Sequence, residues 1–225
     1  MGTMSTGVMR RNAKPADWKT SPIDDQPPRR RAILTAAFEV LMEKGYAGAS
    51  TLDIATRAKV SKRDLYAEFG SKRGILEAMI AVTAERMKVS LETHEVADRE
   101  SFVRALTCYG SAALVELTHP AVTAINRLAA AEADRASELG QLLDRHGREP
   151  HRDALAALFA KAQSAGILQP GDPYRMGGQF FSLLVSDLLF RLLLGVVQPP
   201  DAGEIKRRTA AAVEAVLALN GSRDS

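Results

Sequence analysis

The segment STLDIATRAKVSKRDLYAEFGSK, residues 50–72, decides the fold because it encodes two short helices joined by a tight turn. Ser50 or Thr51 is suited to cap the first helix, and Ser61 is suited to cap the second, which ends at Gly70. Helices of about two turns are unstable alone. Both helices therefore need to pack against other parts of the chain.

The apolar residues of this segment fall on one face of each helix. Ile54, Ala55 and Ala58 form the inner face of the first helix, and Leu65 and Phe69 form that of the second. Ala55 lies where the two backbones approach, so a larger side chain would separate them. This pattern is typical of a helix-turn-helix, which presents its second helix to the major groove of DNA.

The other side chains of the segment point outward and are suited to bind DNA. Lys62 and Arg63 can donate to guanine O6 and N7, and Asp64 can accept from cytosine N4. The hydroxyl groups of Tyr66 and Thr51 can donate to phosphates, as can the ammonium group of a lysine that opens the next helix. The candidate DNA contacts are Thr51, Leu52, Ser61, Lys62, Arg63, Asp64, Tyr66 and Lys72.

The rest of the chain is predicted to be helical, which makes the fold class all-α. Residues 1–28 contain four prolines and no apolar period, so we expect a disordered arm. A helix follows them and stops at Gly45, where a left-handed residue is needed. A longer helix begins at Lys72, and no segment shows the alternation of a strand. Further helices are expected at 100–118, 120–134, 137–147, 150–166, 173–195 and 202–219.

Composition indicates a soluble protein with a basic first third. The chain has 225 residues, of which 46% are hydrophobic and 25% charged. Residues 1–80 hold 14 Lys and Arg against 9 Asp and Glu, whereas residues 81–225 hold 16 against 18. A basic front on a slightly acidic body favours a polyanionic partner.

Three features bear on the compartment. The single cysteine, Cys108, excludes an intramolecular disulfide and fits a reducing cytoplasm. The N-terminus lacks the apolar segment of a secretory signal. The apolar stretch at 180–197 carries Asp187 and Arg191 near its centre, where an i, i+4 pair can form, so we expect a buried helix and no membrane span.

Residues 50–80, STLDIATRAKVSKRDLYAEFGSKRGILEAMI, resemble the DNA-binding signature of the TetR family of one-component transcriptional regulators. The matching features are the Ser-Thr opening, the Asp-Ile-Ala run, the Val-Ser turn, the pattern S-K-x-x-L-Y and the pattern F-x-S-K. The resemblance covers about residues 30–80. More loosely, INRLAAAEADRASELGQLLDRHG, residues 125–147, is similar to the regulatory domain of AefR-like members.

Three residues depart from the family pattern. Lys59 stands where the turn usually has glycine, and a left-handed lysine costs roughly 1 kcal/mol. Leu52 occupies a position that is often polar, where it can contact a thymine methyl group instead. Glu68 stands where a phosphate-binding histidine is common, and its carboxylate would repel DNA unless it turns away. These departures bear on which operator sequence the protein recognises, and not on whether it belongs to the DNA-binding class.

The resemblance implies two domains, a three-helix helix-turn-helix at 29–75 and a larger helical ligand-binding and dimerisation domain at 76–225. It implies a homodimer through the last two helices, for which the candidate residues are Phe181, Leu184, Leu188, Leu192, Val213, Val216 and Leu217. It also implies an internal pocket for a small molecule, for which the candidates are Phe102, Leu106, Tyr109, Asn126, Arg127, Phe159 and Phe180. Packing inside a single chain remains the alternative for both sets.

The function that follows is a repressor that binds a palindromic operator as a dimer and is released by a small molecule. Its partners are double-stranded DNA, a second copy of the chain and an unidentified effector, with no cofactor, no metal and no membrane. The four histidines form no HExxH motif, and the sequence lacks a nucleophile elbow or a glycine-rich phosphate loop, so we expect no catalytic residues and no enzyme. A helical ligand-binding or scaffold dimer that no longer binds DNA remains open.

Overall fold

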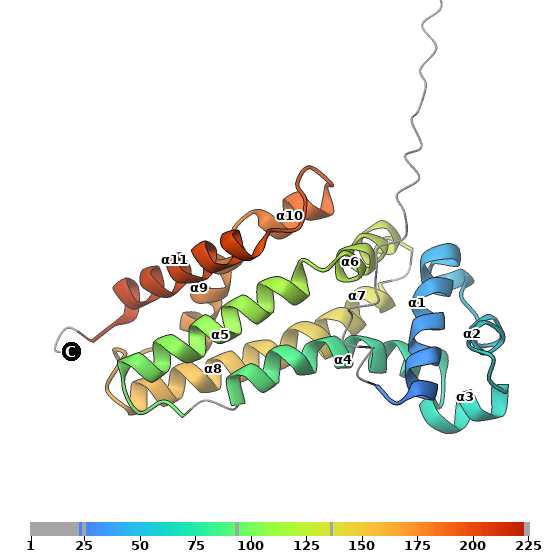
Figure 1. Ribbon diagram of the computed structural model, residues 1–225, viewed down its shortest axis with the longest axis horizontal. Coiled ribbons are helices and arrows are strands. Elements are labelled where there is room, and N and C mark those ends of the chain that lie inside the picture. Colours follow the sequence, from blue (N-terminus) through green and yellow to red (C-terminus); the bar gives the residue numbers. More distant parts are fainter. Residues whose placement is uncertain (1–22, 24–25, 93–94, 136, 223–225) are drawn as a thin grey trace, which may run out of the picture.

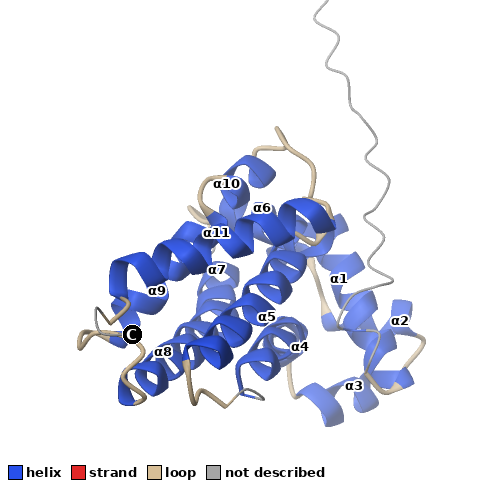
Figure 2. Ribbon diagram, turned by 60° about the vertical axis from the view of Figure 1, so that its left-hand side comes forward, coloured by secondary structure: helices blue, strands red, loops and turns tan. Residues whose placement is uncertain are grey.

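The computed structural model describes residues 23, 26–92, 95–135 and 137–222, apart from the side chains of Thr83 and residues 86–92. Most of the predicted disordered arm lies outside the described residues. Figure 2 shows that the described chain is built from helices and the loops between them. One isolated bridge joins Leu168 and Gly221. The all-α fold class is therefore confirmed.

The helices fall into a small head and a larger body (Figure 1). The head contains α1 (Pro28–Gly48), α2 (Thr51–Ala58) and α3 (Lys62–Phe69), and α4 (Lys72–Glu92) leads from it into the body. The body contains α5 (Arg99–Leu117), α6 (Pro120–Glu132), α7 (Glu138–Leu142), the π-helix η3 (Leu143–Arg148), α8 (Glu149–Ser164), α9 (Pro173–Val185), α10 (Leu188–Leu193) and α11 (Ala202–Asn220).

Two hydrophobic clusters hold the fold together. In the head, Ile33, Ile54 and Leu65 bury the inner faces of α1, α2 and α3 against the first turns of α4. The same cluster continues into the body through Ile125 of α6 and Leu139 of α7. The head therefore rests on α6 and α7 as well as on α4.

The body cluster is centred on aromatic side chains from α5, α8 and α9. Phe102 and Phe159 pack edge to face with ring centroids 5.4 Å apart, and Tyr109 lies 6.3 Å from Phe180. All four side chains are fully buried. Helix α11 closes this cluster from the side of α5 and α9, with Val216 buried in it.

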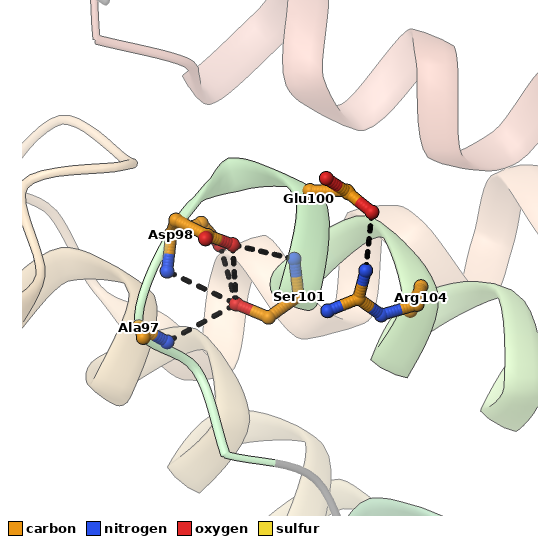
Figure 3. A network of polar contacts seen from close by, with 5 residues as sticks. All are labelled: Ala97, Asp98, Glu100, Ser101 and Arg104. Carbon is orange, nitrogen blue, oxygen red and sulfur yellow. Dashed lines mark hydrogen bonds and ion pairs between the residues drawn. The ribbon is translucent and has the colours of Figure 1, made fainter.

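The N-terminus of α5 shows why the body helices start where they do. The Asp98 carboxylate accepts the backbone N–H of Ser101 at 2.8 Å, and the Ser101 hydroxyl accepts the N–H groups of Ala97 and Asp98 (Figure 3). Glu100 and Arg104 then pair along the exposed face of the helix. This reciprocal capping box fixes the first turn of α5.

Two predicted helices differ in the structure. The expected helix at 173–195 is interrupted, because Ser186 adopts a positive φ of 45° and separates α9 from α10. The predicted pair of Asp187 and Arg191 does form, at 3.7 Å along α10. The expected helix at 137–147 is α-helical only to Leu142 and continues as the π-helix η3. None of the helices in the described residues is long and apolar enough to cross a bilayer.

Candidate nucleic-acid interface and internal cavity

Helices α2 and α3 begin with the serine caps that the sequence indicates. The Ser50 hydroxyl accepts the N–H of Asp53 at 3.1 Å, and the Ser61 hydroxyl accepts the N–H of Asp64 at 3.0 Å. Ser50, and not Thr51, is therefore the cap of α2. The hydroxyl group of Thr51, in the first turn of α2, is not used for capping.

The turn between α2 and α3 confirms the left-handed lysine. Lys59 has φ 56° and ψ 41°, its N–H donates to the carbonyl of Thr56, and the N–H of Val60 donates to the carbonyl of Ala55. These two bonds form a Schellman motif, in which glycine is the usual left-handed residue. The turn thus keeps the angle of a helix-turn-helix at the expense of backbone strain in Lys59.

The outward face of α3 is exposed and carries positive charge. Lys62, Arg63 and Tyr66 are exposed, and the Lys62 ammonium lies 6.0 Å from the centre of the Tyr66 ring. Within the part of the chain that the structure describes, Arg63 forms no ion pair. Leu52, in the first turn of α2, is 59% exposed, so its side chain can reach a neighbouring molecule.

The acidic residues of α3 are paired with arginines of α1. Arg29 lies 2.9 Å from the Asp64 carboxylate, and Arg30 lies 3.4 Å from the Glu68 carboxylate. The hydrogen bond from Ser61 and the one from Arg29 lower the pKa of Asp64 below its ordinary value. In this arrangement the Asp64 carboxylate accepts a hydrogen bond from Ser61 at the start of α3 and pairs with Arg29 of α1. The Glu68 side chain turns towards α1.

Two hydroxyl groups from different helices meet at one edge of this face. The Thr51 hydroxyl of α2 lies 3.1 Å from the Tyr66 hydroxyl of α3. Because the first N–H groups of a helix have no intrahelical acceptor, the N-terminus of α2 adds donors beside this pair. Together these groups are suited to hold a phosphate between α2 and α3.

Lys72, the remaining candidate, is anchored on the end of α1. Its ammonium donates to the backbone carbonyl of Tyr46 at 2.9 Å and lies 4.4 Å from the centre of the Tyr46 ring. A lysine ammonium has three donors, so two remain for a phosphate.

Tyr46 also connects the head to the body. Its backbone N–H donates to the Glu132 carboxylate at the end of α6. Burial and a hydrogen bond with Glu138 of α7 raise the pKa of the Tyr46 hydroxyl. Nearby, the His146 imidazole of η3 lies 3.5 Å from Glu77 of α4. Helices α6 and α7 thus contact the head through polar groups, and η3 contacts α4, which joins the head to the body.

A cavity of about 810 Å³ lies within the body and reaches the head at Phe38 of α1. Its walls come mainly from α4, α5, α6, η3, α8, α9 and α10, with the largest share from α6. Among the predicted ligand contacts, Tyr109 and Asn126 lie on this wall, and Asn126 donates to the carbonyl of Val122 in its own helix. His151 and Gly147 also line it and were missed by sequence reasoning, because no motif marks them.

The other predicted ligand contacts lie elsewhere. Phe102, Leu106, Phe159 and Phe180 are fully buried in the body cluster and do not line this cavity. Arg127 instead donates to the carbonyls of Leu192 and Leu193 at the end of α10.

Most predicted dimer contacts are already covered within the chain. Leu184, Leu188, Leu192, Val213, Val216 and Leu217 are buried in the body cluster, and Phe181 is half-buried on the cavity wall. Other apolar side chains of the same helices and of the loop after α10 face outward. These exposed residues are Leu183, Phe190, Leu194, Val196 and Leu219.

Two family models match the chain. The model of bacterial regulatory proteins of the tetR family matches residues 33–79, which contain the helix-turn-helix. The model of the C-terminal domain of AefR-like transcriptional repressors matches residues 104–221.

Related proteins match along nearly their whole length. A TetR transcriptional regulator of known structure from Agrobacterium tumefaciens is 31% identical, with a TM-score of 0.71 over 88% of this chain and 97% of that one. The Flavonoid-responsive Regulator FrrA is 27% identical, with a TM-score of 0.69 over 87% of this chain and 98% of that one. The uncharacterized HTH-type transcriptional regulator YvkB of Bacillus subtilis strain 168 is 24% identical over 193 residues, which are 85% of this chain and 98% of that protein.

Proposed function

Because the chain belongs to the TetR family of transcriptional regulators and has an AefR-like C-terminal domain, we propose that it is a repressor that binds duplex DNA through α3 and acts in the cytoplasm. The observation that carries the proposal is the charge on α3. Arg29 and Arg30 neutralise its two acidic side chains, while Lys62 and Arg63 stay exposed for base edges. Thr51 and Tyr66 position the helix on a phosphate.

The proposed assembly on DNA is a homodimer. The outward apolar residues Leu183, Phe190, Leu194, Val196 and Leu219 lie on or beside α9, α10 and α11, which supports a self-complementary contact between two copies. A two-fold dimer places two copies of α3 in successive major grooves, about 34–36 Å apart. The operator is then an inverted repeat.

The proposed signal is a small molecule in the cavity. Asn126 on its wall and Glu132, which holds Tyr46 of the head, belong to the same helix, α6. Gly147 on the wall is adjacent in sequence to His146, which lies beside Glu77 of α4, the helix that joins the head to the body. A ligand that favours another position of α6 or η3 therefore changes the position of the head. The relative FrrA responds to flavonoids by its name, which supports a small-molecule signal.

The test is selection from a random-sequence duplex library at moderate salt, followed by sequencing of the bound fraction. We expect an enriched inverted repeat whose affinity falls steeply as salt rises. Arg63→Ala should weaken binding and relax specificity at one position of each half-site by about 1–3 kcal/mol. Lys161→Ala, an exposed lysine of α8, is the matched control and should bind as the unaltered protein does.

A second variant tests the phosphate contact. Tyr66→Phe should weaken binding equally for all sequences and leave the selected repeat unchanged. If no sequence is enriched at any salt, the proposal fails, and the chain is a ligand-binding or scaffold dimer.

A further inference from the structure

Two polar side chains at the inner end of the cavity have no hydrogen-bond partner. The hydroxyl of Tyr109 and both ring nitrogens of His151 are buried, and within the described part of the chain none of these atoms has a hydrogen-bonding neighbour. Tyr109 belongs to α5 and His151 to α8, and their ring centroids lie 6.5 Å apart on the same stretch of wall. Leaving such a buried group unpaired is unfavourable, because it has lost its hydrogen bonds to water.

The buried side chains of the wall around this pair are uncharged. Leu155 and Phe181 contribute apolar side chains, and Gly177 lets α9 approach α8, since a Cβ there would lie 3.2 Å from the Leu155 Cγ atom. Burial lowers the pKa of His151 to about 4, so its imidazole is neutral at pH 7. The inner end therefore offers hydrogen bonds without charge.

Charged groups lie only at the solvent side of this wall. Asp144 and Arg148 pair at 3.1 Å along η3, and both are more than half exposed. Arg152 is exposed, with its guanidinium 6.0 Å from the Tyr174 ring. His119, a further polar residue of the wall, is half-buried and accepts the N–H of Ala121. None of these groups compensates a charge at the inner end.

We propose that the effector is an uncharged, largely apolar molecule with a hydroxyl group, and that this hydroxyl binds between Tyr109 and His151. A hydroxyl both donates and accepts, so it can satisfy the phenol on one side and a neutral imidazole on the other. A carboxylate or an ammonium group would lose its hydration there without gaining a counter-charge. The inference rests on the proposed function only in treating the cavity as the effector site.

Binding requires a small displacement of the wall. The polar atoms of Tyr109 and His151 have almost no exposed surface. The hydroxyl end of the ligand therefore has to move the side chains that cover these atoms. Its apolar body then fills the remaining cavity, whose volume of about 810 Å³ is in the range that holds drug-sized ligands. The hydroxyl gives orientation, and the apolar body gives most of the affinity.

The experiment is isothermal titration calorimetry without DNA, using three matched probe series. Neutral 4-alkylphenols, from butyl to octyl, are compared with the 4-alkylanisoles and the 4-alkylbenzoates of the same chain lengths. We expect the best phenol to bind about tenfold more tightly than its anisole, and the benzoates to bind more weakly than either. Equal affinity for phenol and anisole, a preference for benzoate, or no phenol binding would overturn the proposal.

A pair of variants assigns the hydroxyl contact. Tyr109→Phe should reduce the preference for phenol over anisole to about twofold or less, without lowering the thermal unfolding midpoint of the empty protein. Tyr174→Phe removes an exposed hydroxyl that bonds Asp153 and should leave the preference unchanged. A lowered midpoint for Tyr109→Phe with the preference intact would assign this hydroxyl a structural role and overturn the proposal.

Failure of the regulatory function is separable from failure of this inference. Calorimetry reports the cavity alone, whereas operator selection reports the head alone. A phenol that binds through Tyr109 but does not release operator DNA leaves the ligand class intact and contradicts the proposed release.

Discussion

Both carboxylate oxygens of Glu132 lie 3.1 Å from the backbone nitrogen of Tyr46 and accept its N–H. Tyr46 directly follows Gly45, whose φ of 73° breaks the helical path of α1. On its other side the Tyr46 carbonyl accepts the Lys72 ammonium. One residue of the head is therefore held by the end of α6 and by a candidate phosphate contact.

Substitution of Gly45 tests this junction. A Cβ atom at Gly45 would lie 2.4 Å from the Glu132 Oε1 atom, so Gly45→Ala displaces the carboxylate from Tyr46. Gly166→Ala is the matched control, because Gly166 also has a φ of 73° but open space around it. We expect the control to lose about 1 kcal/mol of unfolding free energy, and Gly45→Ala to lose about 1 kcal/mol more, as measured by urea denaturation. Equal losses would mean that the Glu132 contact adds nothing.

The left-handed lysine of the turn predicts a stabilising substitution. Lys59→Gly removes the strain of a side chain at φ 56° and should raise the unfolding free energy by about 1 kcal/mol. Lys59→Ala removes the same charge but keeps the strain, so its stability should match that of the unaltered protein. Both variants should bind operator DNA more weakly if the lysine charge acts on phosphate. Equal stabilisation by alanine would contradict the strain argument.

The ion pair between Arg29 and Asp64 predicts an effect on DNA affinity from outside the recognition helix. Arg29→Ala leaves the Asp64 carboxylate uncompensated beside the DNA, and we expect operator affinity to fall by about three- to tenfold. The double variant Arg29→Ala, Asp64→Asn should recover most of this loss in a fluorescence anisotropy titration. Arg104→Ala, which breaks an exposed pair of α5, is the control. A double variant as weak as the single one would exclude this electrostatic role.

Burial of His151 predicts a pH dependence of stability. Its native pKa of about 4 lies below the ordinary value of 6.5, so between these values the unfolded chain binds a proton that the native protein does not. The contribution of His151 to the free energy of unfolding is therefore fully present above pH 6.5. It decreases as the pH falls, and about 3 kcal/mol of it is lost at pH 4. His151→Phe should flatten this part of the stability profile, measured by urea denaturation at several pH values. An unchanged slope would place the titration elsewhere.

The helix-turn-helix could be predicted in detail because its signals are local. Ser61 caps the N–H of Asp64, only three residues later in the sequence. Lys59 stands at the turn position that requires a left-handed backbone conformation. Such caps and turns depend on neighbours within a few residues. Arg29 and Asp64, by contrast, are far apart in the sequence, and their pairing follows only from the packed head.

The helices of the body could be predicted from the sequence, but the partner that covers each apolar helix face could not. Leu184 and Val216 lie on apolar helices with more hydrophobic surface than one contact needs, yet packing inside the chain covers them. Apolar spacing indicates that a side chain is buried and does not indicate by what. The interruption at Ser186 was likewise missed, because the apolar period continues on both sides of it.

The arginines of α1 have a practical consequence for anyone who expresses this protein. Arg29 and Arg30 follow α1's first residue, Pro28, and their side chains compensate the acidic groups of α3. An acidic affinity tag fused close to Pro28, or a shortened gene that begins after Arg30, would alter DNA recognition while every residue of α3 stayed intact. Binding assays are therefore best made with the tag at the C-terminus, because the end of α11 lies on the opposite side of the body from the head (Figure 1).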